Sequence, residues 1–343
     1  MKKNKICLEE FSSLSEKQIS ILMEVGITTI PALAAQNVNE LKVMLDTTLN
    51  RATLILKEAR ENLPSFEIKS AKMLLDLNKT RSYLSTNCVA LDNLLGGKGL
   101  ESSSITEVFA QYGAGKSQIA FSAIVSALLT KKEGGGSVLV IDTEGTTSPE
   151  RILEILGFYR NELDCEPEEL LENIKVIRPK DSAEQTAIVK MFLESQGMGY
   201  MKYAPVTRPL KLLVVDSLTG LFRAEFIGRG TLNERQQKLN EHLRDLYLFG
   251  VKNQIPILIT NQVISSPDPF VYGQIAVGGN IVAHASTYRI SLLKRKNYRV
   301  AKMVDSSRLP ANEVVFKLGR RGILEVDEED LTSEEYLKLK ESH

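Results

Sequence analysis

ITEVFAQYGAGKS, at residues 105–117, joins an apolar run of strand character to a loop that contains two glycines and ends in Lys-Ser. A pattern with helical spacing, SQIAFSAIVSALL, follows at residues 117–129. A strand, such a loop and a helix in this order form a phosphate-binding loop, in which backbone N–H groups and the helix N-terminus face phosphate oxygens. Ala110 stands where the first glycine is expected. The sequence therefore predicts a P-loop over residues 110–117; the competing interpretation is a glycine-rich turn without a ligand.

The residue types in this loop predict ATP and Mg²⁺ as its ligands. Lys116 is expected to reach the β- and γ-phosphates, and the Ser117 hydroxyl is expected to bind Mg²⁺. The candidate nucleotide-binding residues of the loop are Ala110, Gln111, Tyr112, Gly113, Ala114, Gly115, Lys116, Ser117 and Gln118.

Three further apolar runs end in polar residues: VLVIDTEG at 138–145, LKLLVVDS at 210–217 and IPILITNQV at 255–263. Asp216 is expected to hold Mg²⁺ through water. Glu144 is the candidate catalytic base that orients the attacking water, with Asp142 as a structural neighbour. Gln262 is expected to bind the γ-phosphate and to change partner when that phosphate leaves. The alternatives, a capping acid at Glu144 and a satisfied loop amide at Gln262, remain open; Lys116, Glu144 and Gln262 are the catalytic candidates.

The chain around the P-loop divides into regions of different pattern. Residues 8–62 carry apolar side chains at helical spacing, which predicts a small all-helical domain over residues 1–63. Residues 64–84 are interpreted as a linker with a short strand and a helix. From residue 85 to 326, apolar runs alternate with helical stretches, which predicts an α/β core with a mainly parallel central sheet. Its last runs look like a meander of shorter strands, and residues 327–343 form an acidic tail.

The composition excludes several classes of protein. The 343 residues include 43 basic and 43 acidic side chains, so a nucleic-acid site would have to be local. Cys7, Cys88 and Cys165 fit neither a disulfide framework nor a metal site, which favours a reducing compartment. With no apolar run of bilayer length and no secretory signal, we expect a cytoplasmic protein without a membrane partner.

Seven segments occur in an order that resembles the RecA/RadA strand-exchange family, above all the archaeal RadA recombinases and their eukaryotic relatives. They are LDNLLGGKGLESSSITEVF, AQYGAGKSQ, IDTEGTTSPERI, VVDSLTGLFRAEFIGRGTLNERQQKLNEHL, ITNQV, VGGNIVAHASTYRISL and VDSSRLPANEVVF. The resemblance implies a RecA-like P-loop ATPase core. It also implies an ATP-dependent DNA-repair recombinase that forms filaments on single-stranded DNA and exchanges strands with double-stranded DNA.

The resemblance also implies roles for particular residues. Arg223, Arg229 and Arg235 match the basic positions of a first DNA loop, and a second DNA loop at about residues 264–279 includes Phe270, Gly278 and Gly279. A neighbouring copy contributes a cap at VDSSRLP, which places Asp305 near the nucleotide. The linker donates an apolar plug to the next copy. Here Phe66 or Ile68 would serve as the plug, with Ala71 beside it. Homo-oligomers, as a helical filament or a ring, are the expected assembly, and recombination mediators are further possible partners.

Several positions depart from the family pattern. Besides Ala110, Thr147 and Ser148 replace a Phe-Arg pair whose arginine stacks on adenine, and Ser307 replaces a proline of the cap. The glycine-bearing hairpin turns of the family's helix-hairpin-helix domain are missing from the N-terminal helices, which puts DNA binding by this domain in doubt.

The departures keep other functions open. The first alternative is a RadA paralogue that binds ATP and regulates or loads a recombinase. A hexameric helicase-like ATPase and a non-catalytic ATP-binding scaffold are the other two.

Overall fold

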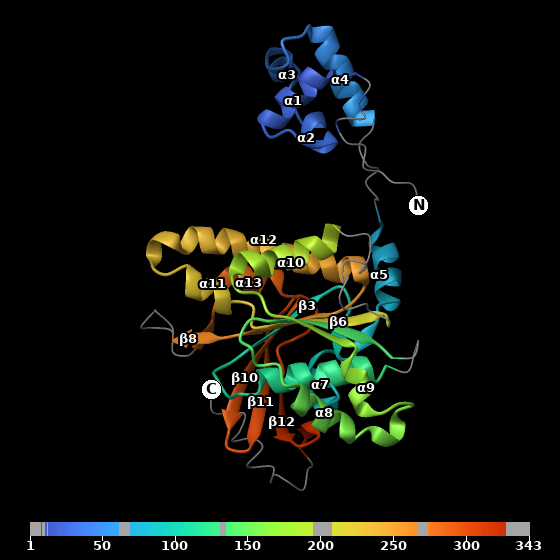
Figure 1. The fold of residues 1–343 in the computed structure, drawn as a ribbon, viewed down its shortest axis with the longest axis vertical. Coiled ribbons are helices and arrows are strands. Elements are labelled where there is room, and N and C mark those ends of the chain that lie inside the picture. Colours follow the sequence, from blue (N-terminus) through green and yellow to red (C-terminus); the bar gives the residue numbers. More distant parts are fainter. Residues whose placement is uncertain are drawn as a thin grey trace. The chain divides into compact units, whose positions relative to one another are not determined.

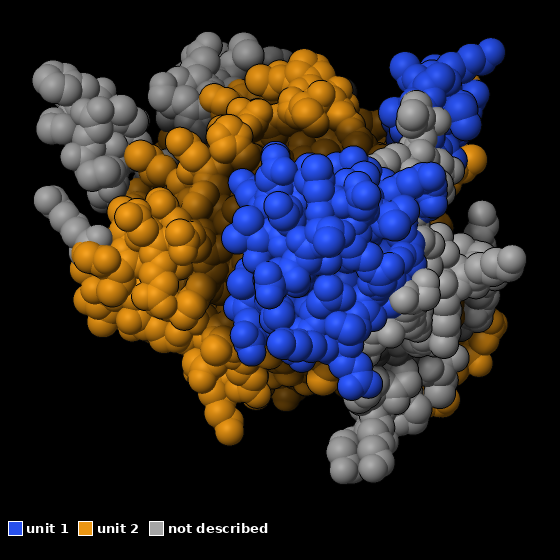
Figure 2. Space-filling view, turned by 90° about the horizontal axis from the view of Figure 1, so that it is seen from above, with its two compact units in different colours: residues 1–78 blue, residues 79–343 orange. Residues whose placement is uncertain are grey.

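The computed structural model describes residues 8, 11, 13–61, 69–130, 135–194, 208–265 and 274–326. The chain divides into two compact units, residues 1–78 and 79–343, which Figure 2 colours separately. The division falls inside the predicted linker, residues 64–84. Each unit is described by itself.

The N-terminal unit is helical, as its apolar spacing predicts. Ser15 caps the first helix with Gln18 in a capping box, and Thr29 caps the second with Pro31 near its start. The longest helix buries Ala52, Ile55, Leu56 and Ala59 on one face. The helices are α1 (Glu16–Glu24), α2 (Ile30–Ala34), α3 (Val38–Met44), α4 (Leu49–Glu61) and α5 (Ala71–Lys79).

Helix α5 differs from the other four because none of its residues is buried. Ala71 is its first residue and is exposed. Phe66 and Ile68, the two candidates for the apolar plug, lie outside the described residues.

The second unit is built on a sheet that has nine strands among the described residues, in the order β13-β12-β11-β10-β3-β7-β6-β4-β5. Strands β10, β3, β7, β6, β4 and β5 pair in parallel, and β10 to β13 form an antiparallel meander. Their bounds are β3 (Ile105–Phe109), β4 (Ser137–Asp142), β5 (Ile174–Ile177), β6 (Leu210–Asp216), β7 (Ile257–Asn261), β10 (Tyr288–Arg295), β11 (Tyr298–Ser306), β12 (Glu313–Gly319) and β13 (Gly322–Glu325). The predicted α/β class with a mainly parallel sheet is confirmed.

Helices cover both faces of this sheet, which explains why its central strands are almost entirely apolar (Figure 1). The core on one face includes α7 and α8, and the core on the other includes α11 and α12. The helices are α6 (Val89–Leu94), α7 (Lys116–Leu128), α8 (Pro149–Gly157), α9 (Pro167–Leu171), α10 (Ser182–Glu194), α11 (Gly220–Glu225), α12 (Leu232–Asn253) and α13 (Gly279–Ala285). Two short antiparallel pairs, β1 (Tyr83–Leu84) with β2 (Leu100–Glu101) and β8 (Val263–Ser265) with β9 (Gln274–Ala276), complete the elements.

The strand register brings the predicted site residues to one edge of the sheet. Asp142 of β4 lies opposite Asp216 of β6, and Phe109 of β3 lies opposite Asn261 of β7. Because these strands are parallel, the P-loop after β3 and the polar ends of β4, β6 and β7 share the same carboxyl edge.

Candidate nucleotide-binding site

The P-loop has the backbone geometry that a phosphate cradle needs. Gly113 and Gly115 lie in the left-handed region, with φ of 73° and 112°. A Cβ at Gly115 would also lie 3.0 Å from Leu318 Cδ1. Both the positive φ and this close approach therefore disfavour a larger residue at position 115. Gly115 is the N-cap of α7, whose N-terminus therefore faces the loop. Ala110 is buried and its φ is outside the left-handed region, so no glycine is required at that position.

Lys116 lies across this loop. Its Nζ donates to the carbonyls of Ala110 and Gln111, at 3.1 and 3.2 Å. Burial lowers the pKa of Lys116, while Asp216 and Glu144 nearby oppose that shift. The γ-phosphate of a triphosphate offers this cation a stronger partner than two carbonyls, so the residue fits the predicted role.

Ser117 and Asp216, the two magnesium candidates, are in contact. Ser117 Oγ donates to Asp216 Oδ2 at 2.8 Å, and Thr260 donates to Oδ1. Burial raises the pKa of Asp216, against the effect of these two hydrogen bonds. Among the described residues, no group of three or more His, Cys, Asp or Glu side chains could hold a metal ion. A Mg²⁺ here would therefore take Ser117 from the protein and its other ligands from phosphate and water, with Asp216 holding one of the waters.

Glu144 and Gln262 meet directly beside the P-loop. Gln262 Nε2 donates to Glu144 Oε1 at 2.6 Å, and Ser217 Oγ donates to the same oxygen at 2.6 Å. Lys116, Glu144 and Gln262 line one hollow of about 350 Å³. Its full lining is Ala110, Gln111, Tyr112, Lys116, Glu144, Gln262, Val263 and Ile264. The three catalytic candidates, from three different strand ends, are thus gathered at one place.

Arg223 connects the first candidate DNA loop to this hollow. It lies on α11, is exposed, and donates from Nη1 to Gln262 Oε1 at 2.8 Å. The amide of Gln262 therefore accepts from Arg223 with its oxygen and donates to Glu144 with its nitrogen.

The other DNA-loop candidates that the structure describes fall in the elements that follow α11 and β9 along the chain. Arg229 belongs to the short 3₁₀ helix Arg229–Thr231, and Arg235 lies in the first turn of α12 and is half-buried. Gly278 is the N-cap of α13 with a φ of 90°, and Gly279 is its first residue. Phe270 lies outside the described residues.

Asn261, which the sequence reading passed over, joins both candidate DNA loops to the P-loop strand. Its Nδ2 donates to Glu107 Oε1 at 2.8 Å and to the Val277 carbonyl at 2.7 Å. Its Oδ1 accepts from the Thr219 hydroxyl at 2.8 Å. The sequence does indicate such a role for Asn261. An asparagine next to Gln262 in a buried strand must find hydrogen-bond partners inside the protein.

Ser148 has a structural role that explains its side chain, whereas Thr147 makes its contact through the backbone. The backbone N–H of Thr147 donates to Asp142 Oδ2, and Ser148 is the N-cap of α8. Arg151, three residues later, donates from Nε to Gln118 Oε1 at 3.0 Å. A guanidinium therefore lies against the first turn of α7, although the family's arginine at position 148 is missing. The sequence reading had not singled out Arg151.

Asp305 is exposed on β11, where its backbone lies opposite that of Arg289 in the neighbouring strand β10. It is not among the residues that line the hollow beside the P-loop. The structure thus leaves Asp305 away from the γ-phosphate candidates of its own subunit.

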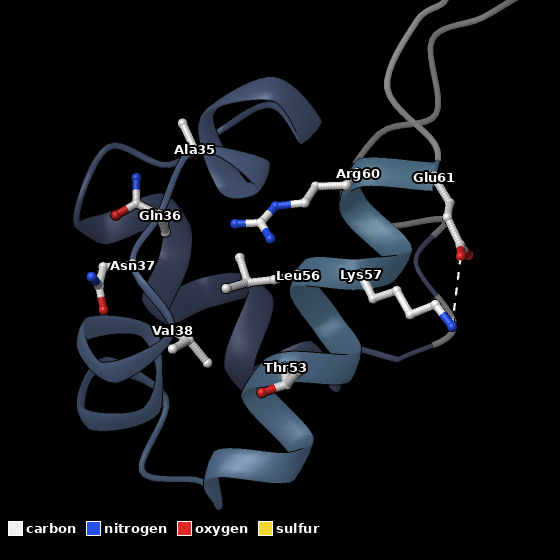
Figure 3. Close-up of a pocket in the computed structure, with 9 residues that line it drawn as sticks. All are labelled: Ala35, Gln36, Asn37, Val38, Thr53, Leu56, Lys57, Arg60 and Glu61. Carbon is white, nitrogen blue, oxygen red and sulfur yellow. Dashed lines mark ion pairs between the residues drawn. The ribbon is translucent and has the colours of Figure 1, made fainter.

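The N-terminal unit carries a hollow of about 780 Å³ between α4 and the segment that joins α2 to α3 (Figure 3). Lys57 lies 3.9 Å from Glu61, and Arg60 Nε donates to the Ala34 carbonyl at 3.3 Å. The turn between α3 and α4 is elsewhere in this unit and holds Asp46 at a φ of 44°. That turn keeps a left-handed residue where the family has glycine, but it carries a carboxylate, which repels DNA phosphate.

The mostly parallel sheet and the glycine-bearing loop between β3 and α7 define the class of RecA-like α/β proteins. The Rad51 family model matches residues 79–326, and the chain belongs to the Rad51 family. It is 36% identical over 326 residues to the DNA repair and recombination protein RadA of Metallosphaera sedula, a match that covers 94% of this chain and 96% of that protein. It is 46% identical over 250 residues to the protein of the same name from Cenarchaeum symbiosum, covering 71% of this chain and spanning 59% of that relative's length. The resemblance to the RecA/RadA family is thereby confirmed.

One finding concerns membranes. Among the residues that the structure describes, no helix combines the length and the apolar character that crossing a bilayer requires.

Proposed function

We propose that this chain is an ATP-dependent recombinase that forms filaments on single-stranded DNA and catalyses homologous pairing and strand exchange with double-stranded DNA in repair. The observation that carries the proposal is the line of hydrogen bonds from Arg223 through Gln262 to Glu144. It joins a DNA-loop candidate to the candidate base of ATP hydrolysis. Such a link is expected in a protein in which DNA binding and nucleotide binding affect each other.

The residues at the sheet edge divide the chemistry of ATP hydrolysis among them. The P-loop N–H groups and Lys116 hold the phosphates, and Ser117 and Asp216 hold Mg²⁺. The metal, when bound with ATP, neutralises charge on the β- and γ-phosphates. Glu144 accepts a proton from the attacking water through Oε2, the carboxylate oxygen that Gln262 and Ser217 do not contact, while the water oxygen bonds to the γ-phosphorus and ADP leaves. Gln262 then turns to the γ-phosphate, which also releases Arg223 for DNA phosphate.

Assembly of copies along DNA uses two regions outside this edge. Asp305 and the cap close over the nucleotide of a neighbouring copy, and the plug at Phe66 or Ile68, with Ala71, enters another neighbour. Burying either apolar side chain contributes about 1.5–3 kcal/mol. The exposed side chains of α5 that support a packing role for this region are Met73, Leu74, Leu75 and Leu77. Filaments or rings are both compatible with these contacts, and mediators are further candidate partners.

The test is D-loop formation by the purified protein with ATP, Mg²⁺, single-stranded DNA and a homologous duplex, run beside Lys116→Ala. We expect D-loops with the unaltered chain and none with the variant, and filaments on single-stranded DNA by electron microscopy. DNA binding should weaken steeply with salt, because the contacts are mostly to phosphate. ATP-dependent DNA binding without strand invasion would instead support the regulatory paralogue.

A further inference from the structure

A buried carboxylate at the end of β2 gathers side chains from three separate segments. Glu101 is 2% exposed, and Arg81 Nη1 lies 2.6 Å from its Oε1. Arg308 donates to the same oxygen, and the Tyr288 hydroxyl donates to Oε2. Burial opposes ionisation of Glu101, but the bonds from Tyr288, Arg308 and Arg81 outweigh it and lower its pKa. The cluster therefore holds a buried negative charge between two arginines.

Arg308 belongs to the segment between β11 and β12. It follows Asp305 by three residues. Ser306 Oγ accepts from the backbone N–H groups of Arg308 and Leu309, at 3.1 and 3.2 Å. Leu309 packs against the core of the sheet. The Ser306 hydroxyl thus stabilises a turn in this segment. Two side chains then attach the segment to the core: Leu309 by apolar packing and Arg308 by its ion pair with Glu101.

This fixation matters because the segment lacks a proline at position 307. A proline would preset the backbone φ, whereas Ser307 leaves it free and is exposed. The Arg308–Glu101 pair supplies the missing constraint from outside the segment. We infer that Glu101 is a positioning residue for the nucleotide held by the neighbouring copy: through Arg308 it fixes the cap that carries Asp305. The inference rests on the proposed head-to-tail assembly.

The same carboxylate also anchors the start of the core. Arg81 lies two residues before β1, and β1 pairs with β2 so that Tyr83 lies opposite Glu101. The chain enters β1 from the linker with the predicted oligomerisation segment. One buried charge therefore sets the position of the cap and of the linker's end, the two regions through which copies are proposed to meet.

A merely stabilising role for the cluster makes a different prediction. The Arg308 side chain is 38% exposed, and Glu101 keeps Arg81 and the Tyr288 hydroxyl as partners when Arg308 is removed, so the buried carboxylate is not left unpaired. Arg308→Ala should therefore leave the unfolding midpoint almost unchanged. If the pair positions the cap, the same variant should raise the KM for ATP about tenfold with a smaller change in kcat, since only nucleotide retention depends on the cap.

Mixing subunits separates an effect on the neighbour from an effect within the subunit. Arg308→Ala has an intact P-loop but presents a loose cap, whereas Lys116→Ala presents an intact cap but cannot hold ATP. ATP turnover on single-stranded DNA is measured below the wild-type KM while Lys116→Ala is titrated into a fixed amount of Arg308→Ala. We expect turnover per Arg308→Ala subunit to rise about five- to tenfold, because its nucleotide is then capped by intact neighbours.

Glu101→Gln, which keeps the size of the side chain, should behave like Arg308→Ala in the same titration. Arg160→Ala is the matched control, since Arg160 pairs with Glu166 at the surface and should keep the wild-type KM. Turnover that stays low at every mixing ratio means that the cluster acts within its own subunit and overturns the inference. Wild-type turnover per subunit that does not depend on protein concentration overturns the proposed assembly, and the inference falls with it.

Discussion

The side-chain amide of Gln262 donates from Nε2 to Oε1 of Glu144 across 2.6 Å. Ser217 donates to the same oxygen, so both hydrogen bonds fall on Oε1, and Oε2 is the carboxylate oxygen left to accept a proton from water. The contact therefore orients the Glu144 carboxylate beside the P-loop.

Replacing Glu144 by Gln should remove ATP turnover and leave ATP binding intact. An amide cannot accept the proton of the attacking water, and general-base catalysis supplies about 100- to 10,000-fold. Single-turnover hydrolysis and equilibrium binding of a fluorescent ATP analogue measure the two steps separately. Full turnover in this variant would show that Glu144 is not the catalytic base.

Gln262→Ala should uncouple ATP turnover from DNA. The amide is the contact that joins Arg223 to Glu144, so its loss should reduce the stimulation of turnover by single-stranded DNA to less than about twofold. The measurement is steady-state ATPase activity with and without DNA. Gln237→Ala, an exposed glutamine on α12, is the control. Unchanged stimulation would show that the coupling runs through other residues.

A third prediction concerns the buried pair of Glu107 and Arg289. Glu107 is fully buried, and Arg289 Nε lies 2.6 Å from its Oε2. Glu107→Gln leaves the arginine without a countercharge, which should lower the free energy of unfolding by about 3–5 kcal/mol. Urea denaturation measures it. Glu166→Gln, which breaks an exposed pair with Arg160, should cost less than about 0.5 kcal/mol.

Much of this architecture could be predicted from local sequence. The P-loop, the apolar strands and their polar ends are short-range patterns, and parallel strands bring their carboxyl ends together without further information. Glu144 and Gln262 could therefore be placed at one edge, although their direct contact could not.

The contacts missed by the sequence reading link residues far apart in the chain. Arg299 donates to the Ala114 carbonyl across 185 positions, and Arg308 reaches Glu101 across 207. The local sequence around an arginine does not indicate which distant residue it will contact in the folded chain. Asp46 was missed for a different reason: the absence of glycine suggested that the turn had changed, whereas its left-handed backbone is retained.

The buried His242 should make the folded protein less stable in mild acid. It is fully buried on α12, with Gln185 Nε2 at 3.2 Å from its Nε2, and burial lowers its pKa from 6.5 to about 4. The unfolded chain binds this proton more readily, so stability is complete above pH 6.5 and is lost as pH falls toward 4. The loss is about 1.4 kcal/mol for each pH unit in that window.

His242→Gln should remove this pH dependence, since glutamine does not titrate and Oε1 can accept from Gln185. Urea midpoints at pH 7.0 and pH 5.5 give the comparison. The wild-type chain should lose more stability than the variant between these two pH values. An equal loss in both would assign the pH dependence to other groups.

Asp46→Gly should stabilise the N-terminal unit and strengthen its contact with DNA. Glycine relieves the left-handed φ of 44°, which is worth about 0.5–1 kcal/mol, and it removes a carboxylate from the turn whose N–H groups face phosphate in the family. Hydrogen exchange of residues 13–61 and anisotropy of a labelled duplex measure the two effects. Gln254→Gly, at a φ of 56° after α12, relieves similar strain without changing charge. If both variants bind the duplex equally well, the carboxylate of Asp46 does not oppose DNA, and a structural role for this unit is favoured.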